Sequence, residues 1–382
     1  MIKKRYKKIV IDASRNRSGG AIIYLKNFIK HLNLENTQVK EIIIFSHKDI
    51  LDQIPNRSFL VKCSHPLLEM NRFFQIIWQL IYLPYFLKKS KTDILYSTDS
   101  TTFCNHSNSI VFNQDILSFD KQAFNQIPFS LEKIRLFIIK FVQIYSLNNA
   151  KEVIFLSDYA RKTISKHLKK NISYNIIPHG IEENFKKINL EKLNNTTWDY
   201  NSKKKIKIIY VSPLFLYKNH QTVVKAYARL KKKYDNLEIE FIGNYKHNLK
   251  LYNNLIDENS LINESHFTGE LNRKDLIKTL IESDIFVFAS STETFGISLL
   301  EAMALAMPIV CSDKSSLPEV LQNGGLYFDP KDDLQLSNQI ELLITNESLR
   351  KNKSQQARKL ALKFSWDQNT EQFCEILNRL TK

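Results

Sequence analysis

The stretch that decides the fold runs from Ser290 to Pro330 and reads SSTETFGISLLEAMALAMPIVCSDKSSLPEVLQNGGLYFDP. An apolar run at 284–289, rich in β-branched and aromatic residues, precedes it and is typical of a strand. A polar turn ends at Gly296, apolar residues then recur at helical spacing through Leu305, and a second strand is predicted at 308–311. Strand, loop, helix and strand form the βαβ unit of a doubly wound sheet, which binds ligands at the carboxyl ends of its strands.

Two carboxylates stand in this turn and helix. Glu293 lies in the loop and Glu301 lies eight residues later in the predicted helix. Glu293 is therefore expected near the backbone N–H groups of Phe295, Gly296 and Ile297, which have no partner within the helix. Such a corner suits an anionic or polyhydroxylated ligand. From the spacing alone, two solvated glutamates remain an equal alternative.

The same strand–loop–helix pattern recurs along the whole chain. It begins with a strand at 7–13, a loop at 15–20 that holds Gly19 and Gly20, and a helix through about residue 32. The chain has only eight glycines, and each falls in a predicted turn, where positive φ or a close approach of backbones favours glycine.

Length and composition predict two domains. A chain of 382 residues can build two cores of ordinary size, and residues 182–204 are polar, rich in Asn and Lys and without periodicity. We expect an N-terminal domain at 1–181, a linker at 182–204, a C-terminal domain at 205–365 and a last helix at 366–382 that crosses back to the N-terminal domain. Further strands are expected at about 41–46, 59–64, 93–99, 109–115, 152–157, 205–212, 237–243 and 265–269.

These motifs resemble the donor-binding signature of the retaining glycosyltransferases of family 4, the glycosyl transferases group 1. The matching positions are Glu293, Phe295, Gly296, Glu301-Ala-Met-Ala, Pro308, Pro318-Glu319-Val320 and Gly324-Gly325. Ala306 departs from the pattern, because the family usually has glycine there. The resemblance implies an α/β chain with the GT-B fold, in which two Rossmann-like, doubly wound domains face each other across a cleft.

The resemblance also implies roles for single residues. Lys218 matches the lysine that clamps the donor diphosphate, whereas Pro213 stands where the family has an arginine, so that the helix start at Asn219, Arg15 or Arg17 would have to compensate. The catalytic residues expected on this basis are Glu293, Asp115 and Lys218. The donor-binding residues expected are Gly19, Gly20, Lys218, Gly243, Gly269, Leu271, Glu293, Thr294, Phe295, Gly296, Ile297 and Glu301.

Glycosyl transfer requires a stabilised leaving diphosphate and a positioned acceptor hydroxyl. No two aspartates are separated by a single residue, so the Asp-x-Asp motif that recruits a metal ion is absent from the sequence. We therefore expect no metal and no cofactor, with a UDP- or GDP-linked sugar as substrate and its phosphates held by Lys218 and backbone amides. Glu293 would bind sugar hydroxyls, Glu301 the ribose diol, and Asp115 the acceptor hydroxyl. The resemblance implies retention of configuration.

Charge predicts the partners. Residues 1–190 carry 29 basic and 15 acidic residues, a difference of +14, whereas residues 191–382 carry 26 and 24, a difference of +2. This asymmetry favours an anionic membrane surface near the N-terminal half. The expected partners are a nucleotide-sugar and a glycan or lipid-linked acceptor. No nucleic acid is expected, because no recognised nucleic-acid motif is present.

The predicted function is a hexosyltransferase of bacterial surface polysaccharide biosynthesis (lipopolysaccharide or capsule). No signal peptide is recognised, so we expect a cytoplasmic protein that can associate with the inner face of the membrane. The apolar run at 72–89 is too short to span a bilayer. We interpret it first as a helix packed on the sheet and second as a segment that lies on a membrane surface. The predicted helix at 133–150 has the same two interpretations. Two alternatives stay open: a sugar-nucleotide epimerase of GT-B fold, and a catalytically silent GT-B scaffold subunit.

Overall fold

The protein is described here by a computed structural model that covers residues 7–17, 19–188, 205–257 and 265–381. Backbone contacts divide the chain into two units. Unit 1 contains residues 1–124, 128–180 and 365–382, and unit 2 contains residues 125–127 and 181–364. The chain therefore leaves the first unit after Gly180 and returns to it for its last helix.

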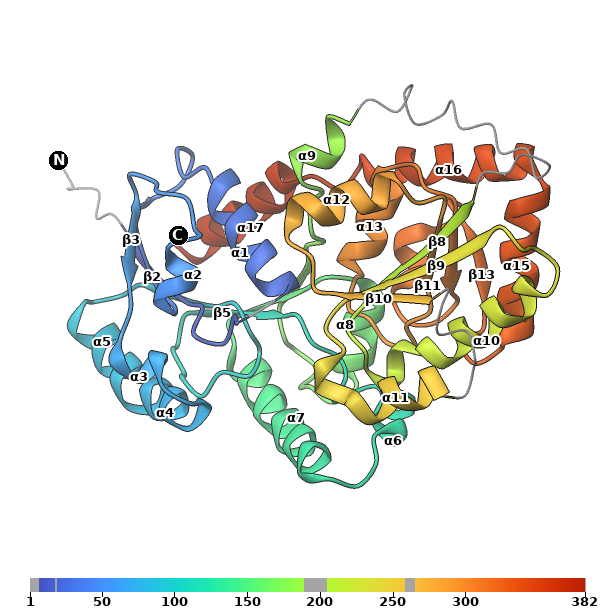
Figure 1. The fold of residues 1–382 in the computed structure, drawn as a ribbon. Coiled ribbons are helices and arrows are strands. Elements are labelled where there is room, and N and C mark those ends of the chain that lie inside the picture. Colours follow the sequence, from blue (N-terminus) through green and yellow to red (C-terminus); the bar gives the residue numbers. More distant parts are fainter. Residues whose placement is uncertain (1–6, 18, 189–204, 258–264, 382) are drawn as a thin grey trace. The chain divides into compact units, whose positions relative to one another are not determined.

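Unit 1 is built on a seven-stranded parallel sheet in the order β3-β2-β1-β4-β5-β6-β7. Its strands are β1 (Lys7–Asp12), β2 (Val39–Phe45), β3 (Leu60–Cys63), β4 (Ile94–Ser97), β5 (Ser109–Asn113), β6 (Glu152–Phe155) and β7 (Tyr174–Ile176). Strand order reverses between β1 and β4, as in a doubly wound sheet. Figure 1 labels β2, β3 and β5 of this sheet.

Helices join these strands. They are α1 (Gly20–His31), α2 (Lys48–Leu51), α3 (Pro66–Glu69), α4 (Arg72–Ile77), α5 (Leu83–Lys89), α6 (Lys121–Gln126), α7 (Leu131–Asn149), α8 (Asp158–Ser165) and α17 (Trp366–Leu380). A π-helical turn, η1 (Trp78–Tyr82), connects α4 to α5 directly before Pro84, whose missing N–H already interrupts α-helical bonding.

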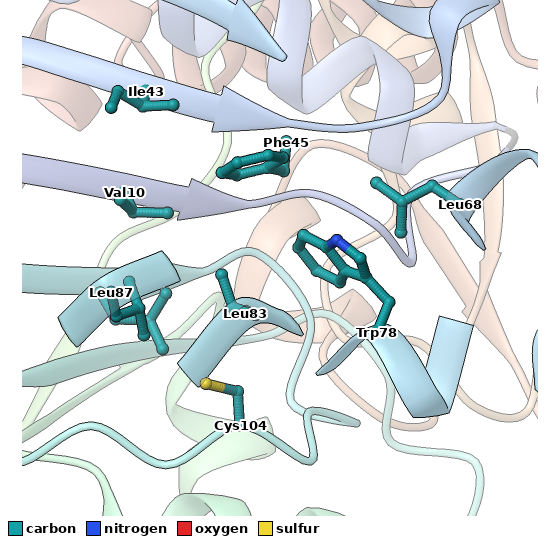
Figure 2. Close-up of a cluster of buried hydrophobic side chains, with 9 residues drawn as sticks. Val10, Ile43, Phe45, Leu68, Trp78, Leu83, Leu87 and Cys104 are labelled. Atoms are coloured by element: carbon teal, nitrogen blue, oxygen red, sulfur yellow. The ribbon is translucent and has the colours of Figure 1, made fainter. Parts of the chain in front are cut away.

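The core over β1 and β2 is apolar. Val10, Ile43 and Phe45 project from these strands toward Trp78 and Leu83 of the α4–α5 segment, and all five side chains are buried (Figure 2). The segment therefore packs on the sheet, as the first reading of the sequence predicts.

Unit 2 repeats the design with a six-stranded parallel sheet in the order β10-β9-β8-β11-β12-β13. Its strands are β8 (Ile206–Val211), β9 (Leu237–Ile242), β10 (Ser265–Gly269), β11 (Ile285–Phe288), β12 (Ile309–Ser312) and β13 (Leu326–Phe328). Its helices are α9 (Glu183–Lys186), α10 (His220–Lys231), α11 (Leu249–Asp257), α12 (Arg273–Ile281), α13 (Ile297–Ala304), α14 (Leu317–Leu321), α15 (Asp333–Thr345) and α16 (Glu347–Ala361), with 3₁₀ turns η3 (Leu216–Lys218) and η4 (Lys246–Asn248).

The segment predicted as a linker, 182–204, begins with a short helix. Residues Glu183–Lys186 form α9, because Phe185 is fully buried and gives this short polar segment an anchor in unit 2. The guanidinium of Arg273 lies 4.9 Å from the centre of the Phe185 ring. Residues 189–204 of the predicted linker lie outside the described residues.

The last helix, α17, packs on α1 within unit 1. Phe373 meets Phe28 edge-on with ring centroids 4.9 Å apart, and the Asp367 carboxylate lies 2.7 Å from Nδ1 of His31. The chain reaches α17 beside Gly180, where an added Cβ would lie 2.2 Å from the backbone nitrogen of Trp366.

Gly180→Ala should lower the free energy of unfolding of unit 1 by about 1–3 kcal/mol, because the methyl group would collide with the backbone that starts α17. Chemical unfolding followed by circular dichroism measures the change. Gly19→Ala is the comparison: its Cβ would meet no atom within 4 Å, so only the positive φ should cost stability, about 1–2 kcal/mol. A Gly180→Ala protein as stable as the wild type would contradict this account of the crossing.

Candidate functional site

The strongest candidate site lies where strand order reverses in unit 2, between β8 and β11. Lys218 comes from the loop after β8 and Glu293 from the loop after β11, and Nζ of Lys218 forms an ion pair with Oε1 of Glu293. Both side chains are largely buried, at 11% and 16% exposure, so water screens this pair weakly. The carboxyl end of a parallel sheet at its switch point is where doubly wound folds bind ligands.

Asn219 fixes the two loops to each other. Its Nδ2 donates to the carbonyl oxygen of Ala289 at 2.7 Å and to Oγ of Ser291 at 2.7 Å, and the Ser291 N–H donates to the Tyr217 carbonyl at 2.8 Å. Asn219 has φ of 51°, a left-handed conformation that asparagine tolerates better than most residues. The backbone of Lys218 is held as well, because the Tyr210 hydroxyl donates to its carbonyl at 2.6 Å.

The turn after Glu293 leads into α13. Gly296 precedes this helix with φ of 92°, and a Cβ there would lie 3.1 Å from Cδ2 of Leu317. Serines of the loop after β12 bind the Glu293 main chain: its N–H donates to Oγ of Ser315 at 3.2 Å, and its carbonyl accepts from Oγ of Ser316 at 3.0 Å. The turn therefore holds Glu293 close to the positive end of α13.

Three further predicted residues flank this turn. Phe295 is 2% exposed and packs edge-on against Phe364, so its side chain belongs to the core and only its backbone can face a ligand. Thr294 lies between Glu293 and Phe295, and Ile297 is the first residue of α13.

Glu301 is buried in a second ion-pair group that the sequence does not predict. Nη2 of Arg273 lies 2.6 Å from Oε1 of Glu301 and 2.5 Å from Oε1 of Glu182. Burial raises the pKa of the Glu301 carboxyl, and the charge of Arg273 opposes that rise. Arg273 is the first residue of α12 and lies outside the 290–330 motif in the sequence. Its importance follows only from the structure, where it is the cation paired with a buried carboxylate.

The loops after β9 and β10 supply the remaining predicted residues of unit 2. The Gly243 N–H donates to the Gly269 carbonyl at 2.9 Å, and Leu271 follows in a partly buried position before α12. A Cβ on Gly243 would lie 2.2 Å from the carbonyl oxygen of Ser212, so glycine lets this loop approach the loop after β8. Pro213 stands at that contact.

His220 is a residue of this edge to which the sequence gives no role. It is the first residue of α10, is 2% exposed and lies against the Tyr210 ring with centroids 4.7 Å apart. Burial, with the charge of Lys218 adding to it, lowers the pKa of His220 to about 3, so its ring is neutral at physiological pH. Because the His220 ring is neutral, it adds no positive charge to the site, and Lys218 is the cation paired with Glu293.

The other predicted residues, Gly19, Gly20 and Asp115, belong to unit 1. Gly19 has φ of 59° and Gly20 begins α1, so the predicted turn ends one residue earlier than expected. Asp115 follows β5, where Oδ1 accepts from the Leu117 N–H at 2.9 Å. Burial raises the pKa of the Asp115 carboxyl, and the neighbouring Asp99 charge adds to the rise. A general base works best when its pKa is close to the working pH, so a raised carboxyl pKa favours this role.

Among the described residues, no group of three or more His, Cys, Asp or Glu side chains is placed to hold a metal ion. The four cysteines are free thiols. In the same part of the chain, no helix has the length and hydropathy needed to cross a membrane.

Comparison with known proteins finds a family that resembles part of the chain. Residues 195–360 match the family model described as glycosyl transferases group 1. The matched segment, which is less than half of the 382-residue chain, resembles this family. The family and the GT-B fold that the sequence predicts are confirmed, and both support a transferase.

Two curated relatives of this chain have names that describe glycosyl transfer. The O-antigen chain mannosyltransferase B of Escherichia coli is 35% identical over 106 residues, 28% of each chain. The N,N'-diacetylbacillosaminyl-diphospho-undecaprenol alpha-1,3-N-acetylgalactosaminyltransferase of Campylobacter jejuni is 34% identical over 119 residues, 31% of each chain. The matched segments thus span about a third or less of these two relatives.

A solved structure shares the fold along the whole length. Anabaena HepE in complex with UDP-glucose superimposes with a TM-score of 0.74 at 17% identity, and the match covers 98% of this chain and 100% of that chain. At that identity the likeness establishes the fold alone.

Removing the arginine of the second ion-pair group tests its electrostatics. Arg273→Met should destabilise unit 2 by at most about 3–5 kcal/mol, because it leaves a buried carboxylate without its cation. The pKa of Glu301, already raised, should rise further in the folded variant. A folded-state pKa above the unfolded value favours folding at low pH and costs stability as pH rises through it, so the deficit against the wild type should be larger near pH 8 than near pH 5.

Urea unfolding at both pH values measures that deficit. The control is Arg273→Met combined with Glu301→Gln, which removes the buried charge and should restore part of the stability and flatten its pH dependence. A deficit that is equal at both pH values, or a double variant no more stable than the single one, would contradict the assignment.

Proposed function

We propose that this protein is a retaining, metal-independent hexosyltransferase that moves a sugar from a UDP- or GDP-linked donor to a glycan acceptor, lipid-linked, during bacterial surface polysaccharide assembly. The observation that carries the proposal is the Lys218–Glu293 pair beside the start of α13, at the switch point of the unit 2 sheet. This edge combines a cation, a carboxylate and backbone amides within one group of loops. A sugar diphosphate presents the complementary groups, namely phosphate oxygens and hydroxyls.

The predicted site residues of unit 2 have the following roles in this proposal. Lys218 and the amides of residues 295–297 would stabilise the charge that develops on the departing diphosphate. Glu293 would accept hydrogen bonds from sugar hydroxyls, and Glu301, positioned by Arg273, from the ribose diol. The glycine loops at Gly243 and Gly269, with Leu271, would lie against the nucleotide.

Unit 1 would supply the acceptor side of the reaction. Asp115, with its raised pKa, would orient or deprotonate the acceptor hydroxyl, and the Gly19–Gly20 turn would contact the donor. The name of the Campylobacter jejuni relative specifies a diphospho-undecaprenol acceptor, which supports a lipid-linked acceptor here. Absence of an Asp-x-Asp motif from the sequence supports a reaction without a metal ion. A place in the cytoplasm, against the inner face of the membrane, follows as part of the same proposal.

Donor identity is tested by thermal shift with a panel of UDP- and GDP-sugars, followed by incubation of the stabilising donor with membrane lipid extract. We expect one nucleotide class to stabilise the protein and radiolabel to move into lipid. NMR of the product should show the anomeric configuration of the donor. Donor conversion without any acceptor would indicate an epimerase, no donor binding would indicate a scaffold, and an inverted anomer would contradict retention.

Substitutions that remove the charges of Lys218 and Glu293 test the roles of these side chains in the reaction. Lys218→Ala should lower kcat by roughly 100- to 1000-fold, because it removes the cation facing the leaving group. Glu293→Gln should lower kcat/KM as well, since the amide cannot replace both acceptor oxygens.

Lys225→Ala, which changes an exposed lysine of α10, is the matched control and should leave the rate unchanged. Rates for Lys218→Ala within a few-fold of that control would refute the role given to Lys218.

A further inference from the structure

The long helix α7 exposes a row of large apolar residues. Five large side chains recur at helical spacing on one face and are each between 42% and 56% exposed: Ile134, Phe137, Ile138, Phe141 and Tyr145. A helix packed on a sheet ordinarily has one apolar stripe, which faces the core, so this outward row is additional.

Polar residues of α7 share the inner face with Leu136 and Leu147. Gln143 and Ser146 are 1% and 3% exposed. Oε1 of Gln143 accepts from the Ser118 hydroxyl at 2.8 Å, and its Nε2 donates to Oγ of Ser100 at 3.1 Å. Because a buried amide needs such partners, these hydrogen bonds fix the rotation of α7 and thereby its outward face.

The α4–α5 segment likewise buries amides, here beside Trp78 and Leu83. Gln75 and Gln79 are 1% and 0% exposed. Nε2 of Gln79 donates to Oδ2 of Asp12 at 2.8 Å, and Nε2 of Gln75 donates to the Ser14 carbonyl at 3.1 Å. The outward side chains are large and apolar, at 53% to 68% exposure: Phe73, Leu80, Ile81 and Tyr85.

Positive charge accompanies both segments. Residues 72–89 contain Arg72, Lys88 and Lys89 and no acidic residue, and residues 131–149 contain Lys133, Arg135 and Lys140 with Glu132 as the one acid. The two segments therefore carry six cations against one anion. Lys89 lies over the Tyr85 ring at 5.8 Å, so its stem covers apolar surface while its charge stays outward.

The segments begin near each other in unit 1. Partial burial lowers the pKa of Arg72, and the positive charges of Arg135 and Arg15 add to that effect, so the starts of α4 and α7 share one electrostatic neighbourhood. Nη2 of Arg17 also lies 3.4 Å from the Met70 carbonyl, just before α4. Figure 1 shows α4, α5 and α7 along the same side of unit 1.

We propose that these nine outward apolar side chains of α4–α5 and α7, the apolar face, dock unit 1 onto the surface of an anionic lipid bilayer. Aromatic and aliphatic residues would enter the headgroup–acyl boundary, and lysines and arginines would contact lipid phosphates. Exposed apolar surface of this extent marks an interaction site, and the near absence of acidic residues matches an anionic partner. The inference extends the proposed lipid-linked acceptor, since it brings the protein to the plane that holds such a substrate.

Vesicle flotation tests the proposal without donor or acceptor, so its failure is distinguishable from failure of the transferase assignment. The wild type should float with vesicles of phosphatidylcholine mixed with phosphatidylglycerol and less with pure phosphatidylcholine. Phe137→Gln combined with Phe141→Gln should weaken partitioning by roughly tenfold or more, because two aromatic side chains no longer enter the bilayer. Leu334→Gln combined with Leu342→Gln, at exposed positions of α15, is the matched control and should float like the wild type.

Charge is tested separately. Lys88→Glu with Lys89→Glu should weaken flotation on anionic vesicles, whereas Lys225→Glu with Lys359→Glu, an equal charge change at exposed lysines of unit 2, should not. Tryptophan emission of Phe141→Trp should shift to the blue on adding anionic vesicles.

Several results would overturn the proposal. The first is a wild-type protein that binds no vesicles, and the second is equal flotation of the phenylalanine and leucine variants. The third is a wild-type dimer in light scattering that binds no lipid and that the phenylalanine substitutions convert to a monomer.

Discussion

The constraint on which unit 2 depends is the pairing of Lys218 with Glu293 at the edge where strand order reverses. Parallel strands bring their carboxyl ends to one edge, so the loops after β8 and β11 meet there although 75 residues separate the two side chains. Asn219 and the serines at 315 and 316 then hold those loops by hydrogen bonds. Opposite charges are kept close together in a largely buried position, and such an arrangement is better suited to binding a dipolar ligand than to stabilising a fold.

Unit 1 is constrained differently. Its α4–α5 and α7 segments bury glutamines beside apolar residues such as Trp78 and Leu147, and they also carry a second row of large apolar side chains on the outside, where such residues are normally few. The buried glutamines lose water but gain partners at Asp12, Ser14, Ser100 and Ser118, so these hydrogen bonds hold the segments with the outer apolar row exposed. An exposed face kept by such bonds implies a surface that is used. The excess of positive charge in residues 1–190 shares its location with that face.

Much of the fold could be predicted from local pattern. The alternation of β-branched runs with helical periodicity predicts α/β layers, and the glycines at 243, 269 and 296 mark turns that do have positive φ. Short elements such as α9 and β13 could not be predicted, because tertiary contacts, including the burial of Phe185, form them. The sequence predicted Glu301 but not Arg273, because which cation pairs with a buried carboxylate depends on how the elements pack in three dimensions. The apolar run at 72–89 was ambiguous because periodicity does not say which face of a helix turns inward.

The central claim is that Lys218 and the start of α13 hold the phosphates of a nucleotide-sugar while Glu293 holds the sugar. A crystal structure of the protein with a bound UDP- or GDP-sugar measures this most directly. The account predicts diphosphate oxygens within hydrogen-bond distance of Nζ of Lys218 and of the amides at 296 and 297, with sugar hydroxyls on the Glu293 carboxylate. Donor bound elsewhere, with Lys218 still paired only to Glu293, would contradict it.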